Sequence, residues 1–223
     1  MIRVLPYCAF LADSRVELPQ FGVDGREVKI LEHGELRVLW SEVKWPYDPQ
    51  AMQRHAVEFH DVVRQVFLKA AVIPFRLLSV FENEASLSAF MSANEAYFVS
   101  DLKRLASAVQ MECVIYFVAG RPQPAESGTA YLREKAGLLQ RIRKSAEEVT
   151  HALGSVTQDL RVREVRNGVR MFVLIERGQE KPFKAAVEAV SVPEALSRRT
   201  SGPWPAAEFL CEELRAPQAP SVK

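Results

Sequence analysis

The residues of this chain that could do chemistry are few, and their spacing does not fit a common kind of site. His55 and His60 fall on one predicted helix, but five positions turn the second imidazole about 140° away from the first. Two histidines on a helix share a metal ion when they are four residues apart, so this pair does not predict a metal site. His33 and His151 are isolated in the sequence.

Carboxylates and thiols give no stronger signal. The adjacent acids Glu147–Glu148 and Glu212–Glu213 are typical of solvated helix faces rather than of a catalytic acid pair. Cys8, Cys113 and Cys211 lie far apart, without the close pairs of a metal knuckle, and are expected to be buried free thiols. A hydrolase using Cys8 or Cys113 would need a neighbouring histidine, which a sequence does not place. We therefore predict a protein that is not an enzyme and holds no metal or other cofactor.

The most distinctive segment places a tryptophan between two prolines near the C-terminus. Trp204 stands between Pro203 and Pro205, behind Gly202 and ahead of Phe209. Each proline fixes its own φ near −65° and biases the preceding residue away from the helical region, so the segment is expected to be extended. Two roles are open for the indole. It could be buried by a terminal strap in a core groove, or it could dock onto a partner.

A second distinctive segment, Ile73–Phe81, places Arg76 beside Phe75 in an otherwise apolar run. A buried guanidinium must satisfy five donors, so we expect Arg76 to be locked to a nearby carboxylate. An acidic residue of a partner is the alternative acceptor. The candidate carboxylates within the chain are Glu82, Glu84 and Glu95.

Taken together, the two segments resemble the gas vesicle protein GvpL/GvpF family. Its members carry a Leu-Pro-Phe-Arg-Phe-Gly-Thr-Val-Phe-like segment and end near Gly-Pro-Trp-Pro-Pro-Tyr-x-Phe. The likeness spans nearly the whole chain and includes His60–Val63 and Gly128–Leu132. The chain departs from the family pattern at Leu77–Ser79 and at Pro205–Ala207.

This resemblance implies a non-catalytic accessory protein of gas vesicle assembly. Family members are understood to bind the small, very apolar shell subunit, and other gas vesicle proteins are further expected partners. A shell subunit needs its apolar face covered before it polymerises, and the terminal strap and exposed sheet edges could cover it. The residues expected to bind a partner or to serve the structure are Pro203, Trp204, Pro205, Phe209, Phe75 and Arg76. The alternative is a ligand-sensing regulatory module of ferredoxin-like type without a gas vesicle role.

Charge and hydropathy limit the kinds of partner. Lys and Arg number 29 against 28 Asp and Glu in 223 residues, a formal net charge of +1. Because positive and negative side chains are nearly equal in number, the protein exerts no long-range attraction on nucleic acid or on an anionic membrane. Neither a secretory signal nor a run of about 20 apolar residues is visible. We therefore expect a cytoplasmic protein, associated with gas vesicles, that binds neither nucleic acid nor membrane and takes no small-molecule substrate.

Apolar periodicity in the first half of the chain predicts a mixed unit of strands and helices. The expected elements are strands at Arg3–Leu11, Glu27–Leu31 and Leu36–Trp40, a helix at Asp48–Ala70, a strand at Val72–Val80, helices at 83–91 and 94–108, and a strand at Met111–Val118. The strand at 72–80 is apolar on both faces apart from Arg76, which suggests a central place in the sheet. The order is ferredoxin-like with an additional hairpin or edge strand.

A stretch rich in helix and strand breakers, Gly120–Gly128, is the expected linker to a second unit. Beyond it we expect a helix at Ala130–Leu153, strands at Leu160–Val165 and Val169–Ile175 around an Asn167-Gly168 type I′ turn, a helix at Pro182–Val190 and a strand at Leu196–Thr200. The fold class is thus α+β with two small domains. Residues 1–120 form an N-terminal ferredoxin-like domain, and residues 129–215 form a C-terminal modified ferredoxin-like domain with the Pro-Trp-Pro strap. Residues 216–223 are expected to be disordered.

Overall fold

The computed structural model describes residues 1–117 and 128–215. The chain divides into two compact units, with the first made of Met1–Ser107 together with the segment from Pro205 onward, and the second made of Ala108–Trp204. No helix in the described ranges is long and apolar enough to cross a membrane. The predicted linker lies outside the described residues except for Gly128, and the predicted disordered tail at 216–223 lies wholly outside them.

The first unit contains an antiparallel sheet with the strand order β2-β3-β1-β4. Its strands are β1 (Ile2–Leu11), β2 (Lys29–His33), β3 (Leu36–Lys44) and β4 (Ile73–Pro74). Side chains point alternately to the two faces of a strand, yet every residue of β1 from Val4 to Phe10 is buried. Both faces of this sheet are therefore covered.

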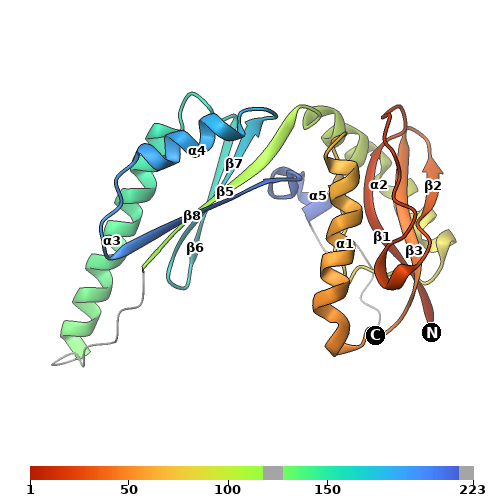
Figure 1. Cartoon of the computed structure of the whole chain (residues 1–223), viewed down its shortest axis with the longest axis horizontal. Coiled ribbons are helices and arrows are strands. Elements are labelled where there is room, and N and C mark those ends of the chain that lie inside the picture. The colour runs from red at the N-terminus through yellow and green to blue at the C-terminus, as the bar shows by residue number, and fades with distance from the viewer. Residues whose placement is uncertain (118–127, 216–223) are drawn as a thin grey trace. The chain divides into compact units, whose positions relative to one another are not determined.

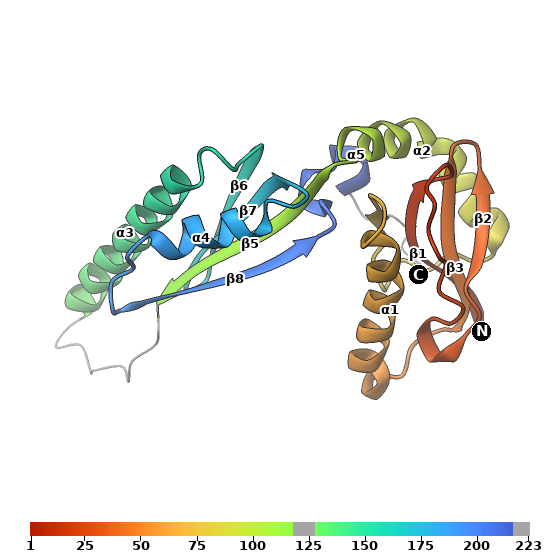
Figure 2. The same ribbon diagram turned by 45° about the horizontal axis from the view of Figure 1, so that its top comes forward.

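Two long helices cover these faces, as Figures 1 and 2 show. On one side, the ring of Phe59 in α1 (Met52–Phe67) packs 5.3 Å from the ring of Tyr7 in β1. On the other side, Glu95 of α2 (Glu84–Arg104) pairs with His33 of β2 at 3.5 Å. The predicted helices at 83–91 and 94–108 form this one helix α2, because no proline or glycine interrupts the apolar period between them.

The predicted central strand at Val72–Val80 is wrong. The structure has only the two-residue strand β4, at the edge of the sheet beside β1. Pro74 has no N–H to donate to a further strand, and the chain then turns, with the N–H of Ser79 donating to the carbonyl of Arg76 at 2.8 Å. The run is apolar on both faces because two helices cover the sheet rather than because it is central in it.

The second unit follows the order β-α-β-β-α-β. Its elements are β5 (Ala108–Phe117), α3 (Gly128–Ala152), β6 (Asp159–Val165), β7 (Gly168–Glu176), α4 (Glu180–Ala189) and β8 (Leu196–Trp204). The sheet order is β6-β7-β5-β8, with every neighbouring pair antiparallel. This is the ferredoxin-like arrangement.

The sequence assigned the strand at Met111–Val118 to the first domain, whereas β5 pairs with β7 and β8 along the second sheet. The α+β fold with two sheet-plus-helix units is confirmed, but the unit that departs from the ferredoxin-like order of elements is the first one. Its strand order corresponds to that of the second unit. Between β1 and β2, however, the described elements include only the 3-10 turn η1 (Val23–Gly25) where the second unit has helix α3.

The predicted hairpin of β6 and β7 is confirmed, but its turn is not the Asn167-Gly168 turn that was expected. Val165 pairs with Gly168, so Arg166 and Asn167 form the loop. Gly168 belongs to β7, where an added Cβ would lie 2.1 Å from the carbonyl oxygen of Ile115. A glycine is needed here because the neighbouring strand β5 approaches too closely for a side chain.

Helices α3 and α4 cover one face of the second sheet (Figure 2). The hydroxyl of Thr150 in α3 contacts the sulfur of Met171 in β7 at 3.9 Å, and Phe183 and Val187 of α4 are buried. Because side chains alternate along a strand, Met171 faces the helices and its neighbour Phe172 faces the other way. One face of this sheet is therefore covered by helices, and the opposite face carries Phe172.

Candidate functional site

The Pro-Trp-Pro segment is extended, as predicted, and its first half ends β8. Trp204 is partly exposed, pairs in register with Gln110 of β5, and donates from Nε1 to the hydroxyl of Ser201 at 3.3 Å. Pro203 is exposed. Gly202 has φ +114°, and an added Cβ would lie 2.9 Å from the carbonyl oxygen of Gln110. The glycine therefore permits the close approach that presents the indole at the end of this edge strand.

From Pro205 onward the chain belongs to the first unit. It forms the 3-10 turn η3 (Ala207–Phe209) and the short helix α5 (Glu212–Arg215). The ring of Phe209 is buried, with only 2% of the residue exposed. The second half of the predicted strap thus inserts an aromatic side chain into the core of the first unit.

A buried carboxylate on α2 holds this returning segment. Asp101, 4% exposed, accepts the N–H of Cys211 at 2.7 Å and pairs with the guanidinium of Arg104. Arg104 in turn donates to the carbonyl of Phe209 at 2.7 Å. A side chain that satisfies backbone groups of a distant segment fixes that segment in place. We name Asp101, Arg104, Phe209 and Cys211 the C-terminal anchor.

The structure separates the roles of Phe75 and Arg76. Phe75 is buried, and its ring stacks 5.9 Å from that of Phe98. Arg76 is exposed and donates to the carbonyl of Arg215 at 3.0 Å. The expected buried lock to a carboxylate is therefore wrong, because the segment turns to solvent after β4. Of the six residues predicted for the site, four lie in the first unit, and Pro203 and Trp204 lie in the second.

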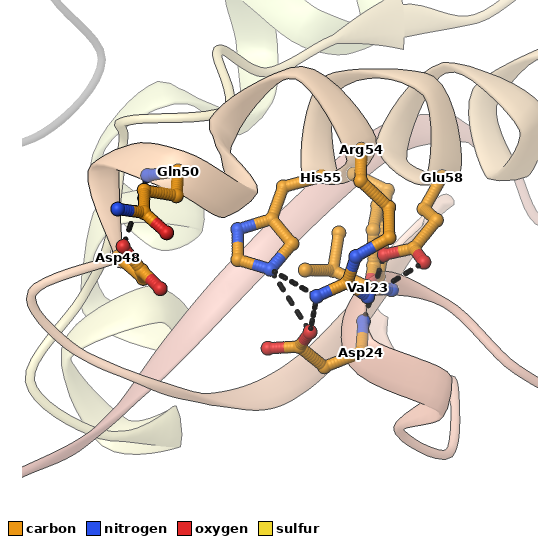
Figure 3. Close-up of polar contacts among 8 residues, drawn as sticks. Val23, Asp24, Asp48, Gln50, Arg54, His55 and Glu58 are labelled. Carbon is orange, nitrogen blue, oxygen red and sulfur yellow. Dashed lines mark hydrogen bonds and ion pairs between the residues drawn. The ribbon is translucent and has the colours of Figure 1, made fainter.

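A polar cluster that the sequence did not reveal joins η1 to α1 (Figure 3). Asp24 has φ +57°, a left-handed conformation that is uncommon outside glycine. One of its carboxylate oxygens lies 2.9 Å from Nε2 of His55 and 2.8 Å from Nη2 of Arg54. Glu58 accepts from Arg54 at 3.0 Å and from the N–H of Asp24 at 2.9 Å. Burial raises the pKa of Asp24, but the bonds from His55 and Arg54 outweigh it, so the pKa is lowered overall.

This cluster has the donor atoms of a metal site but the contacts of an ion-pair network. Ligand atoms of Asp24, His55 and Glu58 all lie within 4.8 Å of one another, a donor set that can bind a divalent cation. The guanidinium of Arg54 already bonds both carboxylates and supplies the positive charge. A metal ion would have to displace it. We therefore infer that the role of this cluster is to hold η1 against α1.

The thiols of Cys8 and Cys113 are poorly suited to nucleophilic attack. Burial raises the pKa of Cys113 to about 11 and also raises that of Cys8. A thiol attacks as the thiolate, so a raised pKa makes both groups unreactive near neutral pH. This environment argues against the hydrolase that the sequence left open.

An open groove of about 470 Å³ runs between α3 and the sheet of the second unit. Its apolar floor includes Ala146, Leu160, Val162 and Val169, and its charged and polar rim includes Arg143, Glu147, His151 and Glu164. Val162 is 52% exposed, although it is apolar. It lies on β6, an edge strand of the sheet. We name this feature the β6 groove.

An ion pair joins the two walls of the β6 groove. Arg143 on α3 donates to Glu164 on β6 at 2.7 Å, and both side chains are more than half exposed. Exposed ion pairs contribute little to stability. The pair can therefore separate at small cost. The sequence predicted exposed sheet edges as a binding surface, but it did not show that α3 and β6 form one groove.

Comparison with known proteins gives the following matches. Residues 4–210 match the model of a family described as gas vesicle synthesis protein GvpL/GvpF. The fold resembles the crystal structure of gas vesicle protein GvpF from Anabaena sp. PCC7120, with a TM-score of 0.76, 16% identity, and coverage of 94% of this chain and 96% of that chain. It also resembles GvpF from Microcystis aeruginosa, with a TM-score of 0.75, 15% identity, and coverage of 94% and 99%. No curated protein matches the chain.

Proposed function

Because the chain belongs to the gas vesicle synthesis protein GvpL/GvpF family, we propose that it is a non-catalytic accessory protein of gas vesicle assembly. It binds the small hydrophobic shell subunit together with other gas vesicle proteins, and it acts at the gas vesicle. The observation that carries the proposal is the family match over residues 4–210, which covers most of both units and every residue of the C-terminal anchor except Cys211. The raised pKa values of the buried thiols of Cys8 and Cys113 and the ion-pair network around Arg54 support a role without catalysis.

The β6 groove is our choice for the surface that receives the shell subunit. A subunit whose apolar face ends against gas must be shielded from water and from premature polymerisation. The groove has an apolar floor and a charged rim, which is the usual composition of a protein-protein interface. The exposed Val162 places an apolar side chain where a partner can cover it. An apolar segment of the shell subunit would therefore lie between α3 and β6.

The edge position of β6 offers a second means of binding. On its outer side an edge strand presents backbone N–H and C=O groups that can pair with an added strand. Side-chain burial in the groove and backbone pairing at the edge could act together on one extended apolar segment. Trp204 ends β8, at the opposite edge of the same sheet, so it is not part of this groove.

The other predicted residues fit structural roles within the first unit. Phe75 and Phe209 are core aromatic residues, and Arg76 bonds the carbonyl at the end of α5. Pro205 begins the return of the chain to this unit. In the second unit, Trp204 is partly exposed and Pro203 is exposed, so a contact of these two residues with another gas vesicle protein stays part of the proposal.

Co-purification tests this function directly. The protein and the shell subunit from the same genome are co-expressed, with an unrelated apolar helical protein as the negative control. Val162→Glu places a charge on the floor of the β6 groove, and we expect it to reduce capture of the shell subunit at least about tenfold. Val57→Glu is the matched control, because Val57 is 57% exposed on α1 of the other unit. Capture that is unaffected by Val162→Glu would exclude the groove, and absence of capture by the native protein would favour the ligand-sensing module.

A further inference from the structure

The face of the second sheet that points away from α3 and α4 carries a row of arginines. The strand register places Arg163 of β6 opposite Arg170 of β7, Arg170 opposite Val114 of β5, and Val114 opposite Arg199 of β8. Three of the four positions in this row are therefore arginine, and all three side chains are exposed. Met171, the neighbour of Arg170, contacts α3, so the row lies on the other face.

This arrangement is electrostatically costly within the second unit. Like charges directly opposite one another on antiparallel strands repel, as Arg163 and Arg170 do. Both guanidiniums lie over the ring of Phe172, at 5.2 and 5.9 Å from its centroid, and this stacking offsets part of the repulsion. Within the described ranges, neither Arg170 nor Arg199 forms an ion pair.

The row is a local feature of an almost neutral protein. The whole chain has a formal net charge of +1, so these arginines do not reflect a generally basic composition. The next row towards the start of β6 carries Arg161, Phe172, Glu112 and Ser201. A fourth arginine thus lies beside the row. The carboxylates of this face, Glu112, Asp159 and Glu176, lie beyond the row towards the start of β6 and the end of β7, so the positive charge is concentrated at the row itself.

We propose that the arginine row binds an acidic segment of a partner protein. The planar guanidinium accepts a carboxylate in a two-point contact, which favours arginine over lysine at such surfaces. Neighbouring strands are about 4.8 Å apart, so the row presents its charges at about 5 and 10 Å intervals. Acidic residues three or four positions apart on a helix are about 5–6 Å apart. An acidic helix lying across the strands therefore matches the spacing.

The same geometry argues against single-stranded nucleic acid on this face. Such ligands bind by stacking their bases on open aromatic rings in a basic groove. Phe172, the ring beneath the row, is only 4% exposed and is covered by two guanidiniums. The proposal is independent of shell-subunit binding, because the row and the β6 groove lie on opposite faces of the sheet.

The test uses a labelled helical peptide of about 20 residues with glutamates three or four positions apart. The comparison ligands are the same peptide with glutamine in place of glutamate, and an oligothymidylate of similar length. Binding to the full chain is measured by fluorescence anisotropy at about 50 and 200 mM salt. We expect the glutamate peptide to bind at least about tenfold more tightly than the glutamine peptide, with the preference declining at higher salt.

Two double variants locate the site. Arg170→Glu with Arg199→Glu reverses two charges of the row, and we expect it to weaken binding of the glutamate peptide at least about tenfold. Arg141→Glu with Lys144→Glu makes the same change in net charge on α3, where both residues are exposed, and should alter affinity less than about twofold. Circular dichroism checks that each variant folds. If the charge-reversed row does not fold, Arg170→Gln with Arg199→Gln replaces it and should still weaken binding.

Three results would overturn the proposal. The first is equal binding of the two peptides to the native protein. The second is an equal loss of affinity in both double variants, which would attribute the attraction to net charge alone. The third is tighter binding of the oligothymidylate than of the glutamate peptide, which would identify the surface as a nucleic-acid site.

Discussion

The C-terminal anchor depends on the carboxylate of Asp101. Asp101→Ala removes the carboxylate that accepts the N–H of Cys211 and pairs with Arg104. A buried backbone N–H left without an acceptor costs about 1–3 kcal/mol, and bonds to a charged group contribute about 1.5–3 kcal/mol. Arg104 is 48% exposed, so water restores much of its solvation and its share of the loss is small. We therefore expect the anchor to be weakened by about 2–4 kcal/mol.

Hydrogen exchange at the amide of Cys211 measures this effect, because exchange reports local opening. A loss of 2–4 kcal/mol corresponds to exchange that is about 30 to 1000 times faster. Asp61→Ala is the control, since Asp61 is an exposed aspartate on α1, and it should change exchange at Cys211 less than about twofold. Protection of Cys211 that survives Asp101→Ala would refute the role that we give to this carboxylate.

Three further predictions concern stability. Gly168→Ala should destabilise the second unit by about 1–3 kcal/mol in denaturant unfolding, because its Cβ would meet the carbonyl of Ile115 at 2.1 Å; an unchanged unfolding midpoint would contradict this. Loss of a fully buried tryptophan lowers the free energy of unfolding by about 3–5 kcal/mol. Trp204→Ala should lower it by less, because the side chain is partly exposed; a larger loss in thermal melting would show that Trp204 is a core residue. The pKa of Asp24 is lowered from its ordinary 3.8 in the folded state, so its contribution to stability is present above that value and is lost as the pH falls through the lowered pKa. In Asp24→Asn the free energy of unfolding should therefore decrease less steeply as the pH falls through the acid range. An identical decrease in both proteins would exclude Asp24 as its source.

Local patterns in the sequence were sufficient for several elements of the fold. The apolar period of α1 and the alternation in β6 and β7 depend on residues close together in the chain, and these elements form where they were expected. The resemblance to the GvpL/GvpF family depended on two short segments, Ile73–Phe81 and Gly202–Phe209, and the match over residues 4–210 confirms it. Both segments combine proline with aromatic residues. Proline restricts its own backbone and that of the preceding residue, which makes such patterns distinctive.

The sequence could not show which strands pair. β5 follows α2 closely in the chain, yet its partners β7 and β8 lie about 50 to 100 residues further on. The apolar run around Arg76 predicts a central strand, because the pattern does not distinguish central pairing from an edge segment beneath two helices. The link between Asp24 and His55 spans 31 positions, and the β6 groove forms only when α3 packs beside β6. Such features arise from tertiary contacts rather than from local patterns.

Capture of the shell subunit by the native protein and by the Val162→Glu variant tests the central proposal most directly. We expect specific, stoichiometric capture by the native chain, a loss of at least about tenfold with Val162→Glu, and retention with Val57→Glu. Capture of the shell subunit at the same level by all three proteins would contradict the groove as the binding surface. Failure of the folded native protein to capture the shell subunit would contradict the proposed function itself.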